Sequence, residues 1–147
     1  MPLRVTPENI AQNVTQSVEH FLSESPTGAK WEALREELLT WIRSIPPGEA
    51  FAGLTFAIET HDRYQVQWIA GDLFLQAGIP CNLSVVEWLE RVVTRFNLSA
   101  NTVIRYGKSV FGRQELTDAV KAALAEDRSA GPRKNRLETM LYWLHDR

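Results

Sequence analysis

The stretch YQVQWIAGDLFLQAG, residues 64–78, decides the fold of this chain. Its apolar residues recur three and four positions apart, which places them on one face of a helix. Tyr64 and Trp68 add a second apolar side, so we expect this helix inside a domain, in contact with neighbours on several sides. Gly78 predicts the end of the helix, and Asp62 is a suitable N-cap residue for its start.

One charged residue, Asp72, interrupts the middle of this apolar stretch. A buried carboxylate without a partner favours its protonated form, so a buried Asp72 requires a partner. We expect an Arg, a Trp N–H or a Tyr hydroxyl within hydrogen-bond distance of it. The neighbouring residues Ile69, Leu73 and Phe74 are expected to be almost fully buried.

The rest of the chain shows the same helical periodicity, and no convincing strand pattern interrupts it. Thr6 followed by Pro7 is a strong helix start, and Ser84 with Glu87 forms a capping-box pattern. The sequence therefore predicts a single all-α domain over residues 1–147, a compact bundle or irregular stack of about seven or eight helices. A polar loop at 127–135 that contains Gly and Pro is expected to be mobile. The expected helices cover roughly residues 7–22, 31–45, 51–58, 64–78, 84–97, 99–112, 116–124 and 137–144.

Composition is that of an ordinary globular protein, with 44% hydrophobic and 23% charged residues. No apolar run approaches the roughly 20 residues of a membrane span, and the N-terminus lacks the apolar core of a signal peptide. The single cysteine, Cys81, cannot form an internal disulfide. These features predict a cytoplasmic protein without a membrane partner.

The net charge of −2 conceals an asymmetry along the chain. Residues 1–90 hold 5 Lys or Arg and 12 Asp or Glu, a net charge of −7. Residues 91–147 hold 11 Lys or Arg and 6 Asp or Glu, a net charge of +5. The basic half suits an anionic partner, and mutual attraction of the two halves explains the pattern equally well.

The most specific local pattern is VVTRFNLSANTVIRY, residues 92–106. A turn at Asn97, a small capping residue at Ser99 and the pair Thr102-Val103 follow one another in this segment. The pattern resembles the helix-turn-helix of DNA-binding proteins, in which a second helix opens after a tight turn. A plain helical hairpin with a serine cap fits the same residues.

The resemblance implies a nucleic-acid interface on the hairpin at 84–111. Asn101, Arg105 and Lys108 are spaced to share one exposed stripe of the second helix. Asn can read adenine, whereas Arg can read guanine or hold phosphate. Five cations and no acid occur from Arg91 to Arg113. The candidate nucleic-acid-binding residues are Ser99, Asn101, Thr102, Arg105, Lys108 and Arg113.

An enzymatic alternative rests on the dipeptide His61-Asp62, which resembles that of HD-type metal phosphohydrolases. That family needs a preceding His and a distant Asp, and His20 and Asp118 occupy loosely compatible positions. The chain contains no P-loop or dinucleotide-binding glycine pattern, and Cys81 has no activating neighbour in the sequence. We therefore expect no catalytic residue, no cofactor and no metal site.

The sequence favours a non-enzymatic binding protein, with a nucleic-acid-binding regulator as the sharpest version. The alternative is a helical protein-interaction or adaptor module, which uses the acidic first half or an exposed Trp143 near the end. DNA, a protein partner and a second copy of the chain all stay open as partners. The oligomeric state, the biological process and any preference for a DNA sequence do not follow from the sequence.

Overall fold

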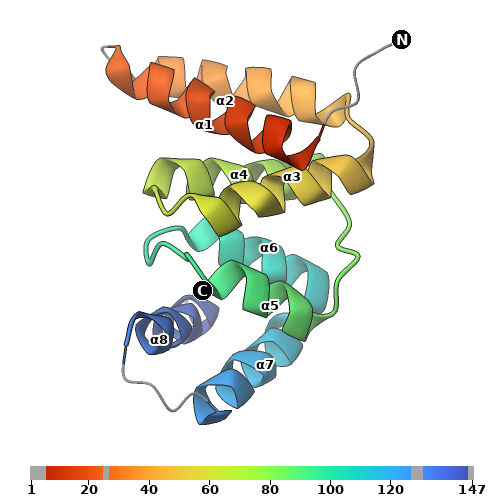
Figure 1. Cartoon of the computed structure of the whole chain (residues 1–147), viewed down its shortest axis with the longest axis vertical. Coiled ribbons are helices and arrows are strands. Elements are labelled where there is room, and N and C mark those ends of the chain that lie inside the picture. Colours follow the sequence, from red (N-terminus) through yellow and green to blue (C-terminus); the bar gives the residue numbers. More distant parts are fainter. Residues whose placement is uncertain (1–5, 25–26, 127–130, 146–147) are drawn as a thin grey trace.

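The computed structural model describes residues 6–24, 27–126 and 131–145, which form eight helices and no strand (Figure 1). The prediction of an all-α fold with seven or eight helices is confirmed. None of the described helices has both the length and the apolar character that a membrane span needs. The helices are α1 (Pro7–Ser23), α2 (Gly28–Arg43), α3 (Pro47–Thr60), α4 (Tyr64–Ala77), α5 (Val85–Val93), α6 (Asn101–Phe111), α7 (Arg113–Glu126) and α8 (Pro132–His145).

The eight helices form four successive pairs that stack along the long axis of the molecule (Figure 1). The pair α1–α2 lies at one end, α3–α4 and then α5–α6 follow, and α7–α8 lies at the other end. Closely packed helices belong either to one pair or to adjacent pairs, such as α1 with α3, α2 with α4 and α4 with α6. The fold is thus a stack of helical pairs in which each pair is supported by its neighbours.

Several predicted helix ends are confirmed. Thr6 caps α1 by accepting a hydrogen bond from the Asn9 amide, and Ser84 and Glu87 form the complete capping box of α5. Gly78 ends α4 in the left-handed conformation, with φ of 63°, which costs glycine little.

Other predicted boundaries are wrong. The N-cap of α4 is Arg63 rather than Asp62, and its side chain makes no capping hydrogen bond. α3 begins at Pro47 rather than near residue 51, because proline is well suited to the first helical position. α8 begins at Pro132 for the same reason, so the second part of the expected loop at 127–135 is helical. Residues 127–130 lie outside the described part.

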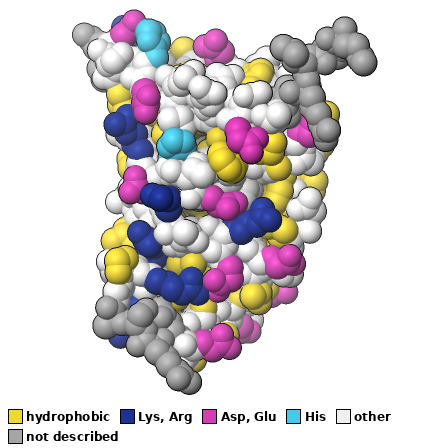
Figure 2. Space-filling view, viewed as in Figure 1, with side chains coloured by type: hydrophobic (Ala, Val, Ile, Leu, Met, Phe, Trp, Pro, Cys, Tyr) yellow, Lys and Arg dark blue, Asp and Glu magenta, His cyan; other side chains and the backbone are white. Residues whose placement is uncertain are grey.

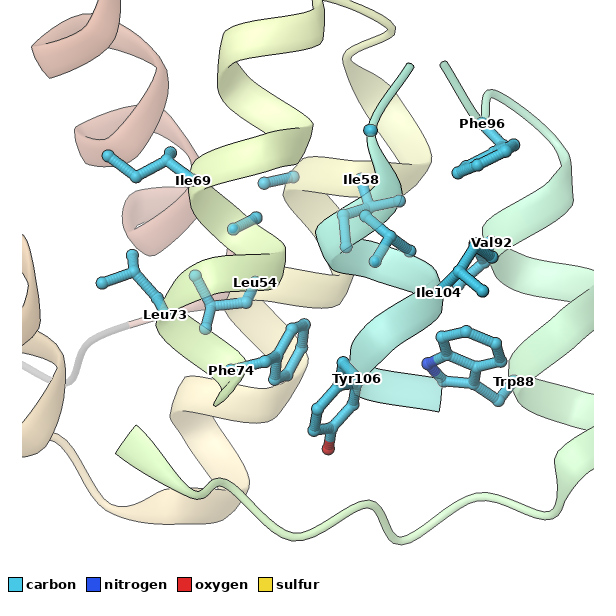
Figure 3. Close-up of a cluster of buried hydrophobic side chains, with 14 of the residues drawn as sticks. Leu54, Ile58, Ile69, Leu73, Phe74, Trp88, Val92, Phe96, Ile104 and Tyr106 are labelled. Atoms are coloured by element: carbon cyan, nitrogen blue, oxygen red, sulfur yellow. The ribbon is translucent and has the colours of Figure 1, made fainter. Parts of the chain in front are cut away.

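The core runs continuously through the stack and centres on α4 and α6 (Figure 3). Ile69, Leu73 and Phe74 are 0–2% exposed, which confirms the prediction for α4. Phe74 stacks on Tyr106 of α6 with ring centroids 4.3 Å apart, and Trp88 of α5 packs against the same tyrosine. The Tyr106 hydroxyl donates a hydrogen bond to the Ile79 carbonyl at 2.7 Å, which satisfies its buried polar end.

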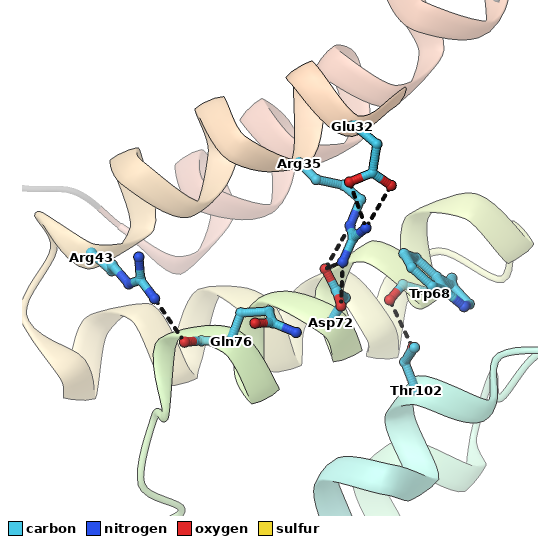
Figure 4. A network of polar contacts seen from close by, with 7 residues as sticks. All are labelled: Glu32, Arg35, Arg43, Trp68, Asp72, Gln76 and Thr102. Carbon is cyan, nitrogen blue, oxygen red and sulfur yellow. Dashed lines mark hydrogen bonds and ion pairs between the residues drawn. The ribbon is translucent and has the colours of Figure 1, made fainter. Parts of the chain in front are cut away.

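The two central helices, α4 and α6, approach most closely at Gly71. A Cβ atom at this position would lie 2.7 Å from the backbone of both Thr102 and Val103. The Thr102 hydroxyl donates a hydrogen bond to the Trp68 carbonyl at 2.7 Å, one helical turn before Gly71 (Figure 4). The absence of a side chain at Gly71 and this hydrogen bond together hold the two helices at a short distance.

Gly71→Ala should therefore destabilise the protein by about 1–3 kcal/mol, because the added methyl group overlaps backbone atoms that cannot move independently. The measurement is the free energy of unfolding in urea. Gly48→Ala in α3 is the matched control, since nothing lies within 4 Å of a Cβ there and alanine favours helix. Equal stability of the two variants would contradict a close approach at Gly71.

Candidate functional site

The turn between α5 and α6, which the helix-turn-helix resemblance singles out, is held by the side chain of Gln67. This residue of α4 is fully buried. Its amide nitrogen donates hydrogen bonds to the carbonyls of Ile58, His61 and Arg95, and its oxygen accepts one from the Asn97 amide at 2.8 Å. The turn is thereby fixed to α4 and to the end of α3.

The predicted geometry of this turn is wrong in three respects. α5 ends at Val93, and no described residue other than glycine has a positive φ, so Asn97 does not adopt the left-handed conformation. Instead the Asn97 side chain accepts a hydrogen bond from the Ser99 amide, which closes an Asx turn. Ser99 does not cap α6, because that helix begins at Asn101 after an Ala100 N-cap without a capping side chain.

The second helix of the expected hairpin packs mainly on α4, and α5 and α6 are not among the closely packed helix pairs. Val103 is buried, as expected. Thr102 is also buried, with 2% exposure, and its hydroxyl is bound to Trp68, so the prediction that Thr102 contacts nucleic acid is wrong. Asn101 and Lys108 are half-buried and Arg105 is exposed, so the free stripe of α6 is narrow.

The cations of this region differ in whether they are paired. Arg91 lies 3.8 Å from Glu59, whereas Arg95, Arg105, Lys108 and Arg113 form no ion pair with any residue in the described ranges. On α8, Arg133 pairs with Glu90 of α5 at 2.8 Å. Figure 2 shows Lys and Arg interleaved with Asp and Glu on one face of the molecule, without a continuous basic patch there.

The residues of the metal-hydrolase alternative do not come together. His20 is exposed and contacts Glu24 at 3.3 Å, and Asp118 lies on α7, in the last helical pair rather than the first. His61 and Asp62 line a small polar hollow of about 170 Å³ with Glu19 of α1. Within the part of the chain that the structure describes, no three His, Cys, Asp or Glu residues are placed to hold a metal ion.

Cys81 is half-buried in the connection between α4 and α5. Burial raises the pKa of its thiol, and the thiol donates a weak hydrogen bond to the Leu83 carbonyl. A thiol with a raised pKa is protonated at neutral pH and therefore a poor nucleophile.

An aromatic groove lies where the end of α1, the start of α2 and the start of α4 meet. We define it by Phe21, Leu22, Trp31, Tyr64, Gln65 and Trp68, which line a hollow of about 360 Å³. The rings of Phe21, Trp31 and Trp68 form a row, with centroids 5.1 and 6.0 Å apart and neighbouring planes tilted by about 50°. Tyr64 is 40% exposed beside them.

Arg35 lies against one of these rings, Trp68 (Figure 4). The Arg35 guanidinium lies over the Trp68 ring, 5.2 Å from its centroid, and donates two hydrogen bonds to Asp72 at 2.9 and 3.0 Å. The remaining guanidinium nitrogen, Nη1, donates hydrogen bonds to both carboxylate oxygens of Glu32. Burial lowers the pKa of Arg35, but the hydrogen bonds and charges of the two carboxylates outweigh burial and raise it above its ordinary value.

The expectation of a partner for Asp72 is confirmed, since the residue is 6% exposed and forms a bidentate pair with Arg35. The sequence does not reveal that Arg35 pairs with Asp72 or that Gln67 holds the turn, because both side chains act across helix contacts that periodicity does not show. Polar residues on otherwise apolar helical faces were the available signal for both.

Trp143 is less accessible than expected. Its side chain is half-buried, and its indole N–H donates a hydrogen bond to the Leu98 carbonyl at 2.8 Å. The neighbouring Tyr142 is the exposed aromatic residue of α8, with 66% exposure. The indole therefore secures the end of α8 on the turn before α6.

Asp72→Ala should reduce the free energy of unfolding by about 1.5–3 kcal/mol, because it removes two charge-assisted hydrogen bonds and leaves Arg35 partly buried beside Trp68. Glu37→Ala on the exposed side of α2 is the control and should change stability by less than about 0.5 kcal/mol. Urea denaturation followed by tryptophan fluorescence measures both. An Asp72→Ala variant as stable as the control would contradict a structural role for the pair.

Comparison with protein-family models, with curated proteins and with solved structures finds no match to this chain. Its function must therefore be inferred from the geometry of its surfaces.

Proposed function

We propose that this protein is a non-enzymatic helical interaction module that binds a peptide segment of a partner protein in the aromatic groove. The observation that carries the proposal is the row of three aromatic rings that lines an open hollow at the meeting point of α1, α2 and α4. Aromatic side chains supply a large contact area at a low cost in conformational entropy. They are accordingly enriched where proteins bind one another.

The contacts that hold Trp68 in place also favour binding. Trp68 contacts both the Trp31 ring and the Arg35 guanidinium. Asp72 and Glu32 bind this guanidinium, and we call the three charged residues the clamp. A surface ordered before it binds loses less entropy on association. The groove is thus suited to a short segment that contributes few contacts of its own.

A second candidate function is nucleic-acid binding through the basic part of the chain. The specific observation in its favour is that Arg95, Arg105 and Arg113 are exposed and form no ion pair with the described residues. Because Thr102 is buried and α6 is flanked closely by α4, this version relies on phosphate contacts rather than on a helix inserted in the major groove.

The first proposal is tested by selecting a random-peptide library on the immobilised full-length protein and titrating an enriched peptide. Tyr64→Ala should weaken binding by about 1–2 kcal/mol, because it removes an exposed aromatic contact without opening the core. Tyr142→Ala, an exposed tyrosine of another helical pair, is the matched control and should bind like the unmodified protein. The absence of enriched peptides, or equal affinities of both variants, would refute the proposal.

The second is tested by titrating duplex DNA at several salt concentrations. Binding should weaken steeply with salt, and Arg105→Ala or Lys108→Ala should each lower the salt slope by about one unit. Tyr64→Ala serves as the control and should leave the slope unchanged. A protein that fails to bind duplex DNA even at low salt would exclude this function.

A further inference from the structure

We infer that the peptide segment bound by the aromatic groove is cationic, with a lysine or arginine side chain lying against the exposed Tyr64. This inference rests on the proposed function and adds the chemistry of the partner. Three features carry it: the charge of the clamp beside the groove, the charge of the surrounding helices, which includes the clamp residues, and the electronic character of the aromatic rings that line the groove.

The clamp beside the groove, formed by Arg35, Asp72 and Glu32, has an excess of negative charge. Arg35 contributes one positive charge, and the two carboxylates that bind it, Asp72 and Glu32, contribute two negative charges. Glu32 is the exposed member of this cluster, with 63% of its side chain accessible. It lies next to Trp31 in sequence and is held near Trp68 by their common neighbour Arg35, so a net negative charge borders the groove.

The helices around the groove also carry a net negative charge. α1, α2 and α4 together carry six Asp or Glu and three Lys or Arg, a net charge of −3. Arg35 is neutralised within the clamp, and Arg43 donates its hydrogen bond to the Gln76 carbonyl on α4. Lys30 also has an interaction of its own. α1 and α4 contain no Lys or Arg, and the exposed Arg63 before Tyr64 is offset by its neighbour Asp62. A basic segment therefore meets a net attractive field.

The aromatic rings that line the groove also attract cations. The face of an aromatic ring carries partial negative charge, which attracts an ammonium or guanidinium placed above it. The protein already uses this attraction once, because Arg35 lies 5.2 Å from the centroid of Trp68. The 40% exposed Tyr64 offers the same chemistry in the groove, where a side chain from a partner has access.

Other occupants fit these features less well. An acidic segment would lie against the excess negative charge of the clamp. A purely apolar segment would use the rings but leave Glu32 without a new partner. A second copy of this chain, whose residues 91–147 carry a net charge of +5, meets the charge requirement and is therefore distinguished by the experiment.

The inference is tested by the composition of the peptides that a random library yields on the immobilised protein. Peptides with Lys or Arg beside an aromatic or aliphatic residue are the expected result. Enriched peptides that are neutral or acidic, but still sensitive to Tyr64→Ala, would overturn the inference and leave the proposed function intact. A selection without enriched peptides would overturn both.

Glu32→Gln then tests the charge directly with the best enriched peptide. This variant keeps the shape of the side chain and should weaken binding about 2- to 5-fold, the range expected for an exposed ion pair. The affinity of the unmodified protein should also fall as salt is added. Glu37→Gln is the matched control, because five residues turn the helix by roughly 140° and place it on another side of α2. Equal affinities of the two glutamine variants would overturn the inference.

Sedimentation of the protein alone tests whether a second copy of the chain occupies the groove. A monomer over the concentrations used for titration is the expected result. A dimer that Tyr64→Ala dissociates and Tyr142→Ala does not would show that a second copy fills the groove, and it would overturn the assignment to a partner's peptide.

Discussion

Two glycines allow helices of neighbouring pairs to approach one another closely. α1 packs on α3 where the side chain of Ile10 covers Gly53, and α4 packs on α6 where the backbone at Thr102 covers Gly71. These are the two most closely packed helix pairs. In a stack where each pair of helices contacts only its neighbours, such contacts determine the spacing from one layer to the next. They also determine where the ends of α1, α2 and α4 meet, and hence the shape of the aromatic groove.

The groove combines elements with opposite effects on stability. Half-exposed aromatic side chains leave apolar surface in contact with water, which favours neither folding nor solubility. The Arg35 clamp offsets this by covering one face of Trp68 and by joining α2 to α4 through Asp72. Compared with two apolar side chains of similar size, a partly buried ion pair adds little net stability, because each charge loses hydration. Removal of one partner alone is nevertheless costly, because it leaves the other charge partly buried and unpaired. Its clearer effect is geometric, since the bidentate pair allows only one orientation of the guanidinium over the ring.

Features that depend on local sequence were predictable, and features that depend on contacts between distant residues were not. The caps at Thr6 and Ser84, the stop at Gly78 and the buried face of α4 follow from spacing and side-chain chemistry. Ser99 had the right chemistry for a cap, yet the contacts of Gln67 with Arg95 and Asn97 draw the turn onto α4 and delay the start of α6 until Asn101. The aromatic groove joins three helices, so no single periodic pattern could reveal it.

The stacked architecture separates the two candidate surfaces. The groove belongs to the first two helical pairs, whereas the unpaired cations Arg95, Arg105 and Arg113 belong to the third and fourth. Each surface therefore lies on its own part of the charge asymmetry, the groove on the acidic half and the cations on the basic half. Because distant sites without shared contacts behave nearly independently, substitutions in one should leave the other intact. Two contacts nevertheless join the two regions. Gln67 of α4 bonds the turn that precedes α6, and Thr102 of α6 donates a hydrogen bond to the carbonyl of Trp68, which lines the groove. If the protein couples binding at the two surfaces, the hydrogen bond from Thr102 to Trp68 provides a direct physical connection between them.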